Sequence, residues 1–174
     1  LSEGYAFDMT VAGPDGESWD LGYPEVQKMC EMLLEQQGPT LLIGSPMCNA
    51  FSKLMTLSKN TSDEVKCQEL IKEGTSHLKF AFKLDQKQRE KGRCFLHEHP
   101  DCAASCQLDF VEELAWKEDV ECVRCDQCAC NQTSVDAYGR GLMLKPTGRL
   151  GNAPRVTDHL RKRYPNRERP REQW

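Results

Sequence analysis

With 174 residues, of which 39% are hydrophobic and 29% charged, the chain has the length and composition of one globular domain with its own core. It has no run of eighteen apolar residues and no charged start followed by an apolar block, so the sequence predicts neither a membrane partner nor a signal peptide. The formal net charge is −4, and the first residue is leucine, which suggests a piece cut from a longer chain at both ends.

The N-terminal third predicts a short strand, a helix and a second strand. Residues 5–10 alternate as a strand does, and a turn rich in glycine follows at residues 13–16. Apolar side chains between Tyr23 and Leu34 fall at helical spacing behind Pro24, and Gly38 ends that helix. The apolar run at residues 41–44 then predicts a buried strand.

The remaining elements continue this alternation. The pattern predicts a long helix from residue 61 or 62 to 92, a strand at 94–98, a helix through 108–115 and a strand at 120–124. A glycine-rich loop leads to a strand at 142–144, and residues 156–164 predict a last helix. Strands that alternate with helices favour an α/β fold with a doubly wound, mainly parallel sheet.

Two candidate catalytic side chains lie at the carboxyl ends of predicted strands, where ligands bind in such folds. Cys48 follows the strand at 41–44 in a turn fixed by Pro46, and Glu98 ends the strand at 94–98. A thiolate can act as a nucleophile when it is partly exposed near a positive charge or a helix amino terminus. The alternative is that Cys48 only packs against its neighbours.

The stretch GSPMCNAFS at residues 44–52 resembles the Gly-x-Pro-Pro-Cys-x-x-Phe-Ser element of the cytosine-5 DNA methyltransferases. The matching residues are Gly44, Pro46, Cys48, Phe51 and Ser52, while Met47 replaces the second proline. One strand later, Glu98-His99-Pro100 stands where the family has Glu-Asn-Val.

Weaker similarity continues toward the C-terminus through Asp126, Tyr138-Gly139 and Lys145-Pro146-Thr147, although the family's Gln-x-Arg-x-Arg element is absent. The order Gly-Ser-Pro-Met-Cys, Glu-His-Pro, Asp-Gln-Cys and Lys-Pro-Thr is also similar to a methyltransferase-like segment of retroelement-type polyproteins of fungi and protists. The resemblance spans residues 41–152 and implies a Rossmann-like methyltransferase core over residues 1–152.

The resemblance implies methylation of a pyrimidine base of nucleic acid, with S-adenosylmethionine as the methyl donor. Cys48 would add to carbon 6 of the ring, and Glu98 would stabilise the charge that develops at nitrogen 3. The base would leave the duplex to reach them. Residues implied to support this chemistry are Pro46, Phe51, Ser52, His99 and Lys145.

The part of the family pattern that binds the methyl donor is missing, because no Phe-x-Gly-x-Gly element occurs in the 174 residues. Asp8, Asp20 and Ser45 are the candidates for donor binding, although Asp8 and Asp20 also fit turn or cap positions. Catalysis therefore depends on residues outside this chain, or it has been lost. The alternative function is a non-catalytic nucleic-acid-binding or scaffold module of a retroelement polyprotein.

The ten cysteines allow a second alternative. Two overlapping Cys-x-x-Cys spacings are formed by Cys122, Cys125, Cys128 and Cys130, and such thiolates can bind zinc. Burial of Cys122 in a sheet beside Val123 argues against that site, so we favour no metal, with free structural thiols and an intracellular, reducing compartment.

The C-terminal end is basic. Between residues 149 and 171 there are eight Lys or Arg residues and only two acidic ones, Asp158 and Glu168. Residues 153–174 therefore predict a basic helix and tail that either binds nucleic acid or is simply solvated. The candidate contacts are Arg161, Lys162, Arg163, Arg167, Arg169 and Arg171, of which the last three lie beyond Pro165 and are expected to be mobile.

Overall fold

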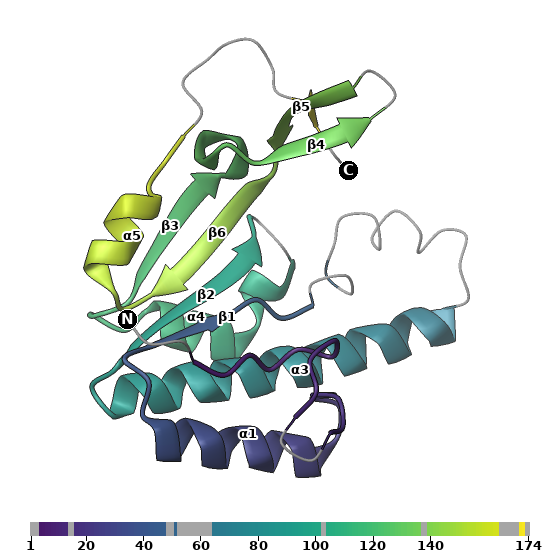
Figure 1. Cartoon of the computed structure of the whole chain (residues 1–174), viewed down its shortest axis with the longest axis vertical. Coiled ribbons are helices and arrows are strands. Elements are labelled where there is room, and N and C mark those ends of the chain that lie inside the picture. The colour runs from purple at the N-terminus through teal and green to yellow at the C-terminus, as the bar shows by residue number, and fades with distance from the viewer. Residues whose placement is uncertain are drawn as a thin grey trace.

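The computed structural model describes residues 4–13, 16–47, 51, 64–101, 104–136, 139–163 and 171–172. These residues form four α-helices, two 3-10 helices and seven strands (Figure 1). In chain order the elements are α1 (Pro24–Gln37), β1 (Leu41–Gly44), α3 (Glu64–Glu90), β2 (Cys94–Pro100), η2 (Ala104–Gln107), α4 (Asp109–Ala115), β3 (Glu121–Asp126), η3 (Gln127–Cys130), β4 (Thr133–Asp136), β5 (Gly139–Leu144), β6 (Pro146–Gly151), α5 (Pro154–Leu160) and β7 (Arg171–Glu172). The protein is thus a mixed α/β structure.

The main sheet has the strand order β1-β2-β6-β3. β1 and β2 are parallel neighbours, with Leu41 opposite Cys94, and α3 connects them. β6 runs antiparallel to both β2 and β3, so β1, β2 and β3 point the same way and β6 points the other way.

The expectation of a mainly parallel sheet is therefore wrong for the described strands, of which only β1 and β2 form a parallel pair in this sheet. A parallel connection needs a crossover of a dozen or more residues, usually a helix. The chain between β3 and β6 instead forms η3 and the antiparallel hairpin of β4 and β5. It then returns beside β3 in the opposite direction.

Helix α3 is buried on two faces and holds the core together. Leu78 and Phe82, four residues apart, pack with Phe95 of β2 and Leu150 of β6. Phe80 and Leu84 pack on the other side, against Cys30, Leu33 and Leu34 of α1 and against Trp19. Because residues i and i+4 lie on one helix face, the sequence of α3 supplies two apolar stripes.

The ends of α1 follow the predicted signals. Pro24 occupies the first turn, where a missing N–H is tolerated. Gly38 adopts a left-handed conformation with φ of 51°, and its N–H bonds to the carbonyl of Leu34. Glycine adopts this conformation without the penalty that a Cβ imposes, which confirms the predicted end of the helix.

The segment at residues 5–10 does not form the predicted strand. Its Asp8 side chain accepts hydrogen bonds from the N–H and the hydroxyl of Thr10, which fixes a turn. Only Phe7 of its alternating apolar residues packs inward, against Trp19 at a ring-centroid distance of 4.8 Å, while Tyr5 and Met9 are exposed. One buried side chain is too little to specify a strand.

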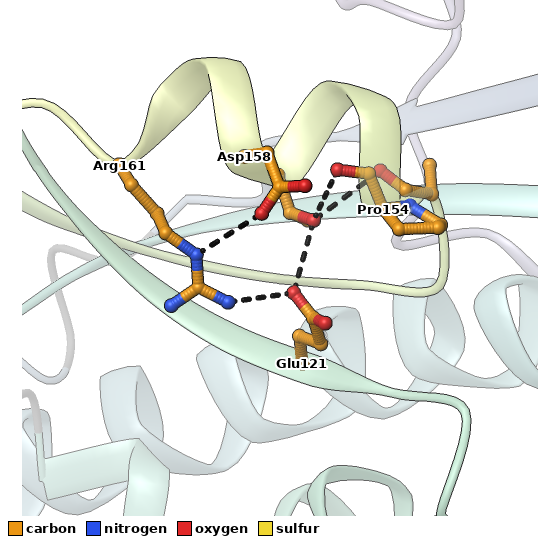
Figure 2. A network of polar contacts seen from close by, with 6 residues as sticks. Glu121, Pro154, Asp158 and Arg161 are labelled. Carbon is orange, nitrogen blue, oxygen red and sulfur yellow. Dashed lines mark hydrogen bonds and ion pairs between the residues drawn. The ribbon is translucent and has the colours of Figure 1, made fainter.

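Helix α5 ends at Leu160, four residues before the predicted end, and it packs on β3. The fully buried Thr157 donates a hydrogen bond to Glu121 of β3 across 3.1 Å. Figure 2 shows the Arg161 side chain between Asp158 and Glu121. Its Nη2 lies 2.8 Å from Glu121 Oε2.

No helix in the described ranges is long and apolar enough to cross a membrane.

Candidate functional site

The candidate site lies at the edge of the sheet where three strands end. Since β1, β2 and β3 point the same way, their last residues Gly44, Pro100 and Asp126 share this edge, and Pro146 starts β6 there. Cys48 and Ser52 lie outside the described residues. The predicted meeting of the Cys48 sulfur with the Glu98 carboxylate therefore stays a prediction.

Glu98 is held by the neighbouring strand. It lies directly opposite Arg149 of β6, and its Oε2 is 2.7 Å from Arg149 Nη1. The two side chains are 24% and 15% exposed, so water screens this ion pair only partly. Within the described residues, the second carboxylate oxygen, Oε1, makes one contact, a long one of 3.4 Å with the Gln127 amide.

A cavity of about 380 Å³ opens beside this carboxylate. Gln127 is fixed at its wall, because its Nε2 donates to Thr147 Oγ1 across 3.1 Å. The remaining lining supplies two cations, a second amide and two thiols. The lining residues are Glu98, Cys125, Gln127, Cys130, Gln132, Met143, Lys145 and Arg149. Such a set suits a polar ligand with an N–H donor for the carboxylate and a negative group for the cations.

The four cysteines of the zinc alternative do not converge. Side chains alternate along β3, so Cys122 and Cys125 lie on opposite faces of the sheet. Cys125 Sγ instead lies 3.6 Å from Cys130 Sγ, and burial raises the pKa of the Cys125 thiol. Within the described part of the chain, no three His, Cys, Asp or Glu side chains are grouped to hold a metal ion.

Six described cysteines have free thiols. They are Cys30, Cys94, Cys122, Cys125, Cys128 and Cys130. Burial is the main cause that raises the pKa of the Cys30 thiol to about 11 and raises the pKa of Cys128. Neither of these two thiols is activated as a nucleophile, because the thiolate is the reactive form. Cys122 is exposed on β3, so the expected burial of its side chain is wrong, and it is the buried Val123 that faces the core.

The supporting residues fall into two groups. Phe51 is buried in the core with Leu78 and Phe95, so its side chain has a packing role, and Pro46 is half-buried beyond β1. Lys145 lines the cavity beside Glu98. His99 lies on the opposite face of β2 from Glu98, with its Nε2 bonded to the Ser105 hydroxyl.

The donor-binding candidates lie outside the cavity beside Glu98. The Asp8 carboxylate is occupied by Thr10, and this hydrogen bonding lowers its pKa. Asp20 accepts a hydrogen bond from the Gly22 N–H in the turn before α1, and Ser45 is exposed. None of the three lines the cavity beside Glu98. Binding of S-adenosylmethionine by these residues stays a prediction.

The basic C-terminal residues are largely engaged within the protein. Arg161 pairs with Glu121 and Asp158, and Arg163 lies 4.0 Å from Asp126. The main-chain carbonyl of Lys162 accepts a hydrogen bond from the Asp126 N–H. Arg171 lies in β7, paired with Met143 of β5, rather than in a mobile tail. Arg167 and Arg169 lie outside the described residues.

Sequence reasoning missed Arg149 and Gln127 as members of the site. Arg149 counted only toward the basic C-terminal end, because β6 was not predicted and so nothing placed Arg149 opposite Glu98. Gln127 belongs to the Asp-Gln-Cys stretch that carries part of the resemblance, which was the available signal.

No protein-family model matches the sequence, and neither a curated protein nor a solved structure matches it.

Proposed function

We propose that the chain is a methyltransferase-like domain that binds a base of nucleic acid in the cavity beside Glu98. The observation that carries the proposal is the combination of a weakly engaged carboxylate oxygen with two cations in one cavity. Glu98 Oε1 is open to an N–H donor of the base, while Arg149 holds the other oxygen of Glu98 and Lys145 offers charge to a phosphate.

The chemistry of pyrimidines supports this assignment. A carboxylate accepts hydrogen bonds from ring or exocyclic N–H groups on the pairing edge of a base, which is exposed only when the base is unpaired or extruded. The Arg149 guanidinium pairs with Oε2 of Glu98, the carboxylate oxygen that does not face the base. The carboxylate is therefore fixed before the ligand arrives. Binding then loses little side-chain entropy.

The finer fold assignment is part of the same proposal. The parallel β1–α3–β2 unit supports a place among the Rossmann-like, doubly wound folds, with β6 as an antiparallel strand within the sheet. Cys48 is proposed as the nucleophile because β1 ends at the edge to which Glu98 belongs.

Fluorescence anisotropy with short labelled oligonucleotides tests base binding. One oligonucleotide carries an unpaired pyrimidine in a duplex, and a matched one carries an abasic position there. Glu98→Gln should weaken binding to the first by about tenfold, the usual effect of losing one good base-edge contact, and leave the second unchanged. Glu113→Gln, an exposed carboxylate of α4, is the control.

Lys145→Gln should weaken binding to both oligonucleotides. It should also lower the slope of log affinity against log salt by about 0.7 to 0.9, which corresponds to one phosphate contact. Equal affinity of wild type and Glu98→Gln for the unpaired pyrimidine would overturn the proposal.

The two candidate functions, an enzyme and a non-catalytic module, differ in whether the protein binds the methyl donor. Calorimetric titration with S-adenosylmethionine should show micromolar to millimolar binding for an enzyme and none for a nucleic-acid-binding module. Where binding is seen, methyl transfer to the oligonucleotide should be lost in Cys48→Ala. Methyl transfer that survives this change would exclude Cys48 as the nucleophile.

A further inference from the structure

A second cavity, of about 360 Å³, lies on the other face of β2, between the sheet and helices α3 and α4. Its walls are mainly apolar and include Phe82 of α3, Val111 and Ala115 of α4, and Leu150 of β6. Alternation along β2 directs His97 toward this face and Glu98 toward the opposite one. Apart from Arg149, which lines both cavities, no residue that lines this cavity also lines the proposed base-binding site, so a ligand here does not require that site.

A buried acid–imidazole pair borders this cavity. His97 Nδ1 lies 2.8 Å from Asp85 Oδ2 of α3, and each side chain is only 1% exposed. The Phe82 ring packs against the imidazole at a centroid distance of 4.4 Å and limits its rotation. A carboxylate that accepts the Nδ1 proton fixes the neutral imidazole in the tautomer whose Nε2 is a hydrogen-bond acceptor.

The free nitrogen of this imidazole indicates what the cavity accepts. Nε2 of His97 is buried and has no hydrogen-bond partner within the described residues. A buried acceptor without a partner is unfavourable, and most such atoms in folded proteins are satisfied. Nδ1 is occupied by Asp85, so Nε2 is the polar atom that His97 can offer to a ligand in the cavity it lines.

We propose that this cavity binds a small, neutral, planar aromatic molecule that donates one hydrogen bond, from a hydroxyl or a ring N–H, to Nε2 of His97. The apolar walls favour an aromatic ring. The acceptor nitrogen selects a ligand with a donor. Asp101, Glu112 and Arg149 also line the cavity, so its charged groups are of both signs and a neutral ligand is favoured.

Phenol and toluene provide a matched pair of probes, because they differ by a hydroxyl in place of a methyl group of similar size. Ligand-observed NMR and calorimetry with the folded chain should show phenol binding at least about tenfold more tightly than toluene, since one buried hydrogen bond is at stake. Phenol should also shift the Nε2 resonance of His97. No binding of phenol, or equal binding of both probes, would overturn the proposal.

Two variants test the geometry. Ala115→Phe should fill the cavity without touching Asp85 or His97 and reduce phenol binding at least about tenfold. Asp85→Asn allows an amide to donate to Nδ1, which moves the ring proton to Nε2 and should remove the preference for phenol over toluene. Glu113→Gln, on α4 outside the cavity lining, should bind both probes as wild type does. Full phenol affinity in a folded Ala115→Phe variant would contradict the assigned site.

Discussion

Glu98 and Arg149 lie directly opposite each other on the antiparallel strands β2 and β6, and their side chains meet at 2.7 Å. This ion pair joins the strand that carries the candidate base contact to a central strand of the sheet. The chain thereby fixes one carboxylate oxygen of Glu98 and leaves the other at the cavity.

The first prediction concerns the stability that this pair provides. Arg149→Gln should lower the free energy of unfolding by about 1 to 3 kcal/mol, because a half-buried carboxylate loses its cation. Arg124→Gln is the matched control, since its pair with Asp101 is also short, at 2.8 Å, but Arg124 is 41% exposed. It should cost less than about 1 kcal/mol. Urea unfolding measures both, and equal losses would contradict the prediction.

The second prediction compares two glycines of β6. A Cβ added at Gly151 would lie 2.6 Å from the carbonyl oxygen of Phe95, which is main chain and cannot move aside. Gly151→Ala should therefore destabilise the protein by about 2 kcal/mol or more. At Gly148 the closest atom, the carbonyl oxygen of His99, would lie at 3.5 Å, which is ordinary contact.

Gly148→Ala should accordingly stay within about 1 kcal/mol of wild type. Thermal unfolding of the two variants checks the comparison. If Gly148→Ala lowers the stability as much as Gly151→Ala does, the close approach of Gly151 to the Phe95 carbonyl is not what excludes a larger residue at position 151.

The same glycines explain why the sequence did not predict β6. The stretch PTGRLG begins with proline and contains two glycines, which are depleted in strands, so local propensity argues against a strand. Pairing with β2 and β3 on both sides overrides that propensity. The missed strand also explains the wrong expectation of a mainly parallel sheet.

Elements that depend on strong local signals were predicted well. α1 and α3 carry helical periodicity, β1 and β2 carry apolar runs, and β3 lies near its predicted bounds. The candidate site was harder to predict from the sequence. Glu98 was found through its motif, but its partner Arg149 depends on the register of β6, and the Asp85–His97 pair depends on how α3 packs on β2. Neither relationship has a signature in local sequence.

The third prediction concerns acid stability. Burial is the main cause that lowers the pKa of His99 from 6.5 to about 4. Between these pH values the unfolded chain binds a proton that the folded chain does not, so the free energy of unfolding should fall as the pH drops from 6.5 toward 4. His99→Gln should make this decrease shallower while keeping a partner for Ser105.

Asp85 acts in the opposite direction, because burial raises the pKa of its carboxyl and protonation then favours the folded state at acid pH. The difference between wild type and His99→Gln isolates the contribution of His99. Chemical denaturation at several pH values gives that difference, and His159→Gln in α5 is the control. Identical pH profiles for wild type and His99→Gln would contradict a half-buried, neutral His99.

The last prediction compares the arginines near the C-terminus with Arg161, which forms ion pairs within the protein. Replacing Arg167, Arg169 and Arg171 together with glutamine should change stability by no more than about 0.5 kcal/mol, because the pairing of β7 uses the main chain. If these arginines bind phosphates, the salt slope of oligonucleotide binding should fall by about 2 to 3, since each lost contact removes about 0.7 to 0.9. Arg161→Gln should instead leave the slope unchanged and cost up to about 1 kcal/mol, because its charge is already paired with Glu121 and Asp158. An unchanged slope in the triple variant would leave the cavity beside Glu98 to account for nucleic-acid binding.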